Sequence, residues 1–188
     1  LCIIAAIGTT GTMSIDPLED IANIAKEFKI WLHVDAAYAG SALFLPECRD
    51  MIKGIEKADS FVFNPHKWLF TNFDCTAYFM KDKHAAINTF SILPEYLKTQ
   101  TDGLVSNHCD WGVPLGRRFR SLKLWFVLRY YGLEGIQSKL RHHINLAIWL
   151  ENKIIESSDF ELLTPRGLNL VCFRYKPLGI KDEEKLNK

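Results

Sequence analysis

Long hydrophobic runs and a charge excess of either sign are both missing from this sequence, and each absence argues against a class of partner. No window reaches the roughly 18 consecutive apolar residues that a membrane-spanning helix needs. The 23 Lys and Arg residues nearly balance the 22 Asp and Glu residues, which leaves a formal net charge of +1. We therefore expect a globular protein that binds neither a membrane nor nucleic acid.

Cysteine is sparse, its count of five is odd, and no C-x-x-C motif occurs. The cysteines are Cys2, Cys48, Cys75, Cys109 and Cys172. This distribution favours free thiols in a reducing cytoplasm over a disulfide framework or a zinc site. We expect a cytoplasmic protein with no metal site.

The apolar run 1–7 has neither a basic lead-in nor a small-residue cleavage site, so we do not interpret it as a signal peptide. The run is typical instead of a buried strand in the middle of a domain, and we expect the chain to be part of a longer protein. Its 188 residues are 48% hydrophobic, enough to bury the core of one domain or slightly more.

Apolar runs alternate with a helical pattern through the first half of the chain, an order typical of βαβ units and a mainly parallel sheet. After the strand at 1–7, Asp16 is a candidate helix N-cap with Pro17 at the first helical position. Further strands are expected at 30–34, 60–64 and 76–80.

A polar stretch, Ser91–Asp110, shows little periodicity, and loops of about twenty residues are usually functional lids or disordered segments. The elements expected after it are helices at 118–131 and 134–157, separated by Gly132, and strands at 160–163 and 168–175. The pattern thus predicts an α/β part over 1–130, including the loop, and a linker helix with the start of a smaller α+β part over 131–188.

Two segments, 33–40 and 64–68, place an acid and an amine after neighbouring strands of the expected sheet. Asp35 and Lys67 would then meet at the carboxyl ends of the strands, where open α/β sheets bind their ligands. Such a pair suits pyridoxal phosphate: the lysine forms an imine with the aldehyde, and the carboxylate keeps the pyridine nitrogen protonated.

Spacing alone leaves other interpretations of these residues open. An aspartate after a strand is often a helix cap, and a lone lysine is usually solvated. His33 and Asp35 could form a metal pair, as in a metallo-hydrolase, although no third ligand stands at a supporting spacing.

A small basic cluster could bind phosphate or nucleic acid, or pair with acidic residues or a neighbouring subunit. It consists of Arg117, Arg118 and Arg120. His142 and His143 are expected on a solvated helix face.

Four longer stretches resemble the aromatic-L-amino-acid decarboxylase family of pyridoxal-phosphate enzymes. They are residues 33–42, 58–68, 72–75 and 114–126, in the family's order, and matching residues run from about Gly8 to Tyr175. The resemblance implies an α/β fold of the PLP-dependent aminotransferase-like class (fold type I). Residues 1–130 would be the C-terminal portion of the large PLP-binding domain, including a mobile loop at 91–110, and 131–188 a linker helix and the start of the small domain.

The resemblance also implies roles at the cofactor. Lys67 is expected to hold it as a Schiff base, Asp35 to pair with the pyridinium nitrogen and Ala37 to pack against the ring. Thr10 matches a threonine that lines the cofactor site.

Three further residues are assigned less directly. Asn64 and His66 match residues around the phosphate and the Schiff base, and His66 could also transfer protons because its charge changes near neutral pH. Ser60 is a weaker phosphate candidate, since it could equally cap its strand.

The expected activity is decarboxylation of tryptophan, DOPA, tyrosine or phenylalanine by a homodimer with active sites at the subunit interface. Tyr96 matches a tyrosine that supports protonation of the α-carbon from a loop closing over the partner subunit's site; aldehyde-forming relatives often carry phenylalanine there. Gly116 matches a position facing the substrate ring, where glycine leaves space for a bulky aromatic group, although it could simply turn the chain. An aromatic aldehyde synthase and a catalytically silent PLP-fold scaffold remain alternatives.

Overall fold

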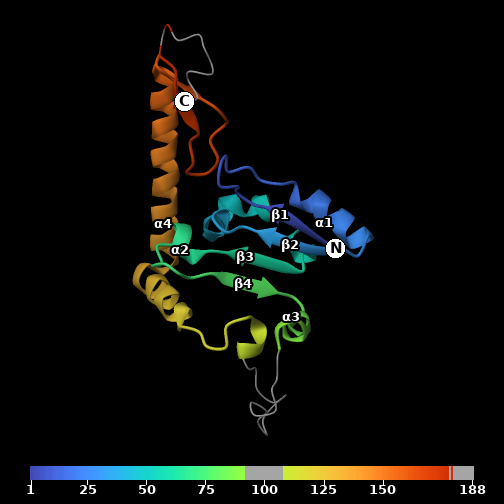
Figure 1. Ribbon diagram of the computed structural model, residues 1–188. Helices are drawn as coiled ribbons and strands as arrows, with labels where there is room; N and C mark the ends of the chain where they lie inside the picture. Colours follow the sequence, from blue (N-terminus) through green and yellow to red (C-terminus); the bar gives the residue numbers. More distant parts are fainter. Residues whose placement is uncertain (92–107, 178, 180–188) are drawn as a thin grey trace.

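The computed structural model describes residues 1–91, 108–177 and 179, and its main feature is a four-stranded sheet beside one long helix (Figure 1). The sheet has the order β1-β2-β3-β4, with the first three strands parallel and the last antiparallel to its neighbour. Its strands are β1 (Cys2–Ala6), β2 (Trp31–Asp35), β3 (Ser60–Phe63) and β4 (Ala77–Met80). The predicted mainly parallel sheet is therefore confirmed.

Helices and short 3₁₀ turns connect these strands. The α-helices are α1 (Leu18–Glu27), α2 (Pro65–Trp68), α3 (Lys83–Phe90) and α4 (Arg120–Glu156), and the 3₁₀ helices are η1 (Ala39–Phe44), η2 (Pro46–Ile52), η3 (Ile55–Lys57) and η5 (His108–Trp111). A separate two-stranded antiparallel sheet, β5 (Phe160–Leu162) and β6 (Phe173–Tyr175), follows α4.

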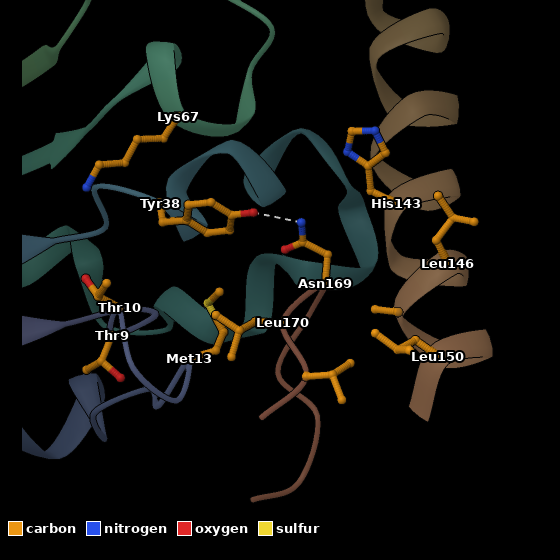
Figure 2. A pocket seen from close by; sticks show the side chains of 12 residues that line it. Thr9, Thr10, Met13, Tyr38, Lys67, His143, Leu146, Leu150, Asn169 and Leu170 are labelled. Atoms are coloured by element: carbon orange, nitrogen blue, oxygen red, sulfur yellow. Dashed lines mark hydrogen bonds between the residues drawn. The ribbon is translucent and has the colours of Figure 1, made fainter. Parts of the chain in front are cut away.

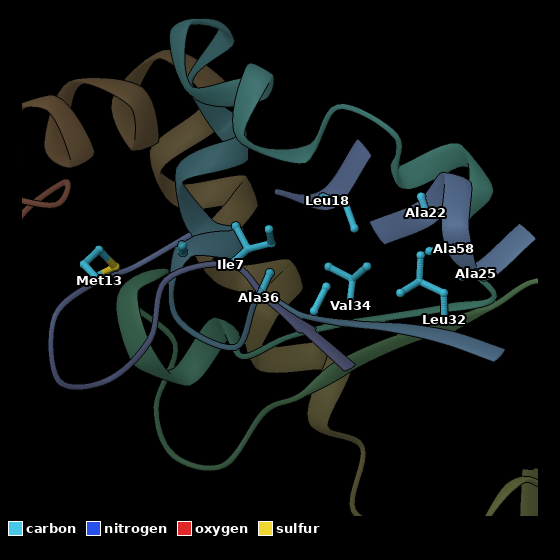
Figure 3. Packing of buried hydrophobic residues seen from close by; sticks show 11 residues of the cluster. Ile7, Met13, Leu18, Ala22, Ala25, Leu32, Val34, Ala36 and Ala58 are labelled. Carbon is cyan, nitrogen blue, oxygen red and sulfur yellow. The ribbon is translucent and has the colours of Figure 1, made fainter. Parts of the chain in front are cut away.

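The hydrophobic core beneath α1 is formed by every second residue of β2 and by every third or fourth residue of α1 (Figure 3). On β2, Leu32 and Val34 alternate with more exposed neighbours, so both side chains point to the face that α1 covers. On α1, residues three or four positions apart line one side of the helix and are buried against that face. These helix residues are Leu18, Ala22 and Ala25.

The start of α1 corrects one prediction. Asp16 does not cap the helix; its carboxylate accepts a hydrogen bond from the backbone N–H of Ala6 at 2.7 Å. Asp16 therefore ties the returning chain to the end of β1, and Pro17 occupies the cap position before Leu18. The local pattern could not tell whether Asp16 would accept from the first turn of α1 or from Ala6, because both places offer a backbone N–H group that has no partner in a helix or strand.

In the C-terminal half, the structure follows the prediction of two helices separated by Gly132. Both predicted helices are present within α4: the chain is helical before and after Gly132, and Gly132, with φ 64° and ψ 178°, forms a kink between the two segments. Both strands predicted after α4 are shorter than expected: β5 ends at Leu162, and β6 begins only at Phe173. Residues 167–170, predicted as part of the second strand or next to it, form a turn. Of the predicted loop 91–110, residues 92–107 lie outside the described part.

None of the helices described is both long enough and apolar enough to cross a membrane.

Candidate active site

The ends of the three parallel strands are joined by backbone hydrogen bonds at one edge of the sheet. The N–H of Ile7, just after β1, donates to the carbonyl of Asp35 at 2.8 Å. The N–H of Asn64, just after β3, donates to the carbonyl of Ala37 at 2.9 Å. The structure therefore brings together the three backbone segments that carry Thr10, Asp35 and Lys67; the strand pattern predicted this for Asp35 and Lys67, and the family resemblance for Thr10.

Lys67 lies on the one-turn helix α2, which directs it away from the core. Pro65 and Trp68 of this helix are buried, whereas Lys67 is exposed. Within the described chain its amino group has no hydrogen-bonding or ionic partner, and it borders a pocket of about 680 Å³. Figure 2 shows Lys67 reaching toward the turn that carries Thr10.

One end of this pocket is formed by α2 and by the segments that follow β1 and β2, and its apolar wall comes from α4 and the turn before β6. The lining residues are Thr9, Thr10, Met13, Tyr38, Lys67, His143, Leu146, Ala147, Leu150, Asn169, Leu170 and Val171. Of the predicted cofactor residues, this lining contains Thr10 and Lys67 but not Asp35, Ala37, Asn64 or His66. The pocket is thus one side of the predicted site and not the whole of it.

Asp35 ends β2 with an exposed carboxylate. One carboxylate oxygen, Oδ1, accepts the N–H of Ala37 at 2.9 Å, and the other has no partner among the described residues. Ala37 itself is half-buried, and its side chain is a single methyl group. The geometry leaves an anionic acceptor free at the strand end.

Two residues earlier on the same face of β2, His33 has a structural partner. Its Nδ1 lies 2.8 Å from the hydroxyl of Ser60, which also accepts from the indole N–H of Trp31 at 3.0 Å. Burial lowers the pKa of His33, while the charge of Asp35 opposes that shift. Ser60 begins β3, at the opposite end from Lys67, so it does not join the other cofactor candidates. No group of three potential metal ligands occurs in the part of the chain that the structure describes.

Asn64 directly precedes α2, and His66 lies within it. The Oδ1 atom of Asn64 is buried and has no hydrogen-bond partner in the described chain. The Nδ1 atom of His66 lies 3.0 Å from the backbone nitrogen and 2.6 Å from the carbonyl oxygen of Cys75. The His66 ring also meets Phe73 edge-on, at 4.9 Å between centroids, so His66 is held at the loop that follows α2.

An ion pair anchors that loop to the start of α4. The guanidinium of Arg120 donates to the carboxylate of Asp74 at 2.9 Å, and this hydrogen bond lowers the pKa of Asp74. One member of the arginine cluster therefore pairs with an acid, as one interpretation of the sequence proposed.

Gly116, predicted to face the substrate ring, does not line the Lys67 pocket of this chain. Gly116 is exposed between η5 and α4, and a Cβ atom added there would have open space around it. Tyr96 lies outside the described residues. Both assignments stay predictions.

Sequence reasoning missed a set of contacts behind Lys67. The ring of Tyr38 stacks on that of Trp68, with centroids 5.2 Å apart and planes 10° apart. The indole N–H of Trp68 donates to Nδ1 of His143 at 3.0 Å. His143 is half-buried, so its assignment to a solvated face was wrong, and burial together with His142 and Lys139 lowers its pKa.

The residues at the strand ends fit pyridoxal phosphate. A primary amine and a carboxylate oxygen, both without partners in the described chain, follow neighbouring strands, which matches the aldehyde and the ring nitrogen of the cofactor. The buried, unpaired Oδ1 of Asn64 is a further polar atom that a bound group would satisfy.

Comparison with known proteins agrees with this geometry. The pyridoxal-dependent decarboxylase conserved domain matches residues 1–176. Tyrosine decarboxylase 2 of Narcissus pseudonarcissus is 51% identical over 92% of this chain and 35% of its own length, and phenylacetaldehyde synthase of Arabidopsis thaliana is 50% identical over 96% and 37%. The crystal structure of Oryza sativa TDC with PLP and tryptamine superposes with a TM-score of 0.93 and 39% identity, over 98% of this chain and 39% of that one.

The chain thus spans little more than a third of the length of the curated relatives it matches.

Proposed function

The chain belongs to the pyridoxal-dependent decarboxylase family, whose cofactor is pyridoxal phosphate, and we propose that the whole protein decarboxylates aromatic L-amino acids to amines and carbon dioxide. The observation that carries the proposal is that the amine of Lys67 and one carboxylate oxygen of Asp35, neither with a partner among the described residues, follow adjacent parallel strands at the same edge of the sheet. Tyrosine decarboxylase and a TDC structure with tryptamine among the similar proteins support an aromatic substrate of the tryptophan, DOPA, tyrosine or phenylalanine type.

The cofactor, when bound, supplies an electron sink for the bond to the departing carboxylate. Lys67 holds it covalently through its amino nitrogen. Asp35 keeps the proton on the ring nitrogen, because a charge-assisted hydrogen bond from that nitrogen to the free oxygen stabilises the protonated form. Ala37 packs against the ring without filling its space.

Thr10, Asn64 and His66 bind and orient the polar groups of the cofactor. Thr10 approaches from the turn after β1, where Gly8 takes φ 85° and a Cβ atom would come within 2.6 Å of the Cβ atom of Ala39. Only glycine therefore lets this turn lie against η1. The Nε2 atom of the His66 ring is still available to exchange a proton or to donate to an oxygen, since the ring contacts Cys75 through Nδ1.

A homodimer with sites at the subunit interface completes the proposal. Tyr96 supports protonation of the α-carbon in the partner subunit, and Gly116 leaves room for the substrate ring. The separation of Gly116 from the Lys67 pocket within one chain supports an interface role. The domain division at 130/131, next to the break at Gly132, and a cytoplasmic location, consistent with five free cysteines, belong to the same proposal.

An aromatic aldehyde synthase is the second candidate, because a phenylacetaldehyde synthase is 50% identical to this chain. Tyr96 favours decarboxylation over that reaction, since the resemblance places phenylalanine there in many aldehyde-forming relatives.

The test is a product assay on the full-length protein with pyridoxal phosphate, offered tryptophan, DOPA, tyrosine, phenylalanine and histidine separately. We expect carbon dioxide and the matching aromatic amine without hydrogen peroxide. Aldehyde with ammonia and peroxide would establish the synthase, and no turnover would favour a silent scaffold. Lys67→Ala is the control, for which we expect neither product nor cofactor that borohydride can fix to the protein.

A further inference from the structure

Two stacked aromatic rings join the loops that carry Asp35 and Lys67, and the proposed reaction makes no use of them. Tyr38 lies three residues after Asp35, and Trp68 directly follows Lys67. The rings are nearly parallel, with centroids 5.2 Å apart. Trp68 is only 4% exposed while Lys67 is exposed, so seating the tryptophan on this short helix turns the lysine outward.

Each ring is also held at its polar atom by a residue far along the chain. The amide of Asn169, in the turn before β6, donates to the hydroxyl of Tyr38 at 2.7 Å. His143 of α4 accepts the indole N–H of Trp68 at 3.0 Å. Figure 2 shows Tyr38 lying between Lys67 and Asn169, with His143 on the helix opposite.

We propose that Tyr38 and Trp68 form a positioning pair that sets the placement of Asp35 and Lys67 toward the cofactor, with Asn169 and His143 as its anchors. The inference rests on the proposed function, because it takes Asp35 and Lys67 as the groups that hold pyridoxal phosphate.

The physical reason is preorganisation. A lysine side chain is long and flexible, so the position of its amine depends on how firmly its backbone is held. The direct backbone bond between the two loops runs from Asn64 to Ala37, before the lysine is reached. The ring stack adds a second connection beyond Lys67, and the two anchors fix that stack against α4 and the C-terminal turn. Groups held in place before binding lose less conformational freedom when the ligand arrives.

The test uses full-length protein carrying Tyr38→Phe or Trp68→Phe. The first change keeps the stack and removes the hydroxyl; the second keeps an aromatic ring and removes the indole N–H. For each we expect the Kd for pyridoxal phosphate to rise about tenfold, equivalent to about 1.4 kcal/mol. The loss of cofactor affinity should exceed what any fall in the melting temperature of the cofactor-free protein accounts for, and kcat should fall with little change in KM.

Two further comparisons separate positioning from general packing. His143→Asn keeps an acceptor oxygen near the position of Nδ1 and should bind the cofactor about as tightly as the wild type. His143→Leu has no acceptor there and should bind it more weakly. Tyr175→Phe on β6 and Trp149→Phe on α4, at residues that are 57% and 59% exposed, are the matched controls and should bind the cofactor as the wild type does.

Wild-type cofactor affinity in both Tyr38→Phe and Trp68→Phe, in an enzyme that still forms amine, overturns the positioning pair and leaves the proposed function intact. Equal affinity of His143→Asn and His143→Leu overturns the anchor, as does a fall in melting temperature that accounts for the weaker binding. If the full-length wild-type protein forms no amine but both variants bind the cofactor tenfold more weakly than it does, the positioning pair is supported and the proposed function is contradicted.

Discussion

Asp35 shows how one carboxylate can serve both the fold and the proposed chemistry. One of its oxygens accepts the N–H of Ala37 at 2.9 Å, which leaves the other for the ring nitrogen of the cofactor. Asp35→Asn keeps an acceptor for Ala37 but removes the negative charge. We expect kcat for amine formation to fall roughly 10²- to 10³-fold without loss of folding.

Steady-state assays together with circular dichroism measure this effect. Asp50→Asn, at an exposed aspartate of η2, is the matched control and should leave kcat unchanged. A kcat for Asp35→Asn within about threefold of wild type would contradict its pairing with the ring nitrogen.

His143 makes the stability of the protein depend on pH. Burial, His142 and Lys139 all lower the pKa of its ring from the usual 6.5. Because the folded-state pKa lies below the unfolded one, the neutral ring contributes stability that is complete above pH 6.5 and is lost as the pH falls through the folded pKa. Protonation also places an N–H where the indole N–H of Trp68 needs an acceptor.

Between about pH 7 and pH 5 we expect the free energy of unfolding to decrease more in the wild type than in His143→Asn, which does not titrate. Urea unfolding at a series of pH values measures the difference. If the free energy of unfolding changes with pH in the same way in both proteins, the pKa of His143 does not differ between the folded and unfolded states, and the prediction is contradicted.

At the scale of elements, the break in α4 depends on one glycine. Gly132 takes φ 64° and ψ 178°, a backbone conformation essentially restricted to glycine. A Cβ atom there would meet nothing within 4 Å, so the constraint is conformational and not one of space. Gly132→Ala should therefore lower the free energy of unfolding by about 1–3 kcal/mol.

Gly135 is the matched control, because it lies in the same helix with ordinary helical dihedrals. Gly135→Ala should change the free energy of unfolding little, since the gain in helix propensity of up to about 1 kcal/mol is opposed by a Cβ contact with Tyr131 at 3.3 Å. Chemical denaturation compares the two variants. Equal destabilisation would place the effect in helix packing and not in the break.

The elements differ in how well local patterns predicted them. The parallel strands were identified because their apolar runs are short and separated by turn signals. Helix α3 was not predicted; Ala86 is its one buried residue, so it has almost no apolar face to detect. The break at Gly132 was predicted because glycine interrupts an otherwise continuous helical pattern.

At the scale of the whole molecule, the start of α4 and the segment before it expose large apolar side chains. They include Val113, Leu115, Phe119, Trp125, Phe126 and Tyr130, each more than half exposed. Exposed apolar groups in such number are typical of a surface that further protein covers, either the rest of the same chain or a second subunit. We expect the 188-residue chain on its own to self-associate or precipitate, and the full-length protein to sediment as a dimer.

Sedimentation velocity on both proteins measures this. Trp125→Glu should weaken the association, and Asn145→Glu, at an exposed polar position of the same helix, is the control that should not. A monomeric full-length protein would contradict the interface role proposed for Tyr96 and Gly116.

The sequence by itself determined the family, the parallel sheet and the meeting of the Asp35 and Lys67 segments. These conclusions depend on short continuous motifs and on the rule that parallel strands bring their carboxyl ends to one edge, so no long-range information was needed. Only the tertiary structure decided what holds Lys67 in place. The bonds from Asp74 to Arg120, from Trp68 to His143 and from Tyr38 to Asn169 span 46, 75 and 131 residues. No periodicity or spacing encodes such pairs, because each partner is selected by how the sheet, α4 and the C-terminal turn pack and not by its neighbours in the chain.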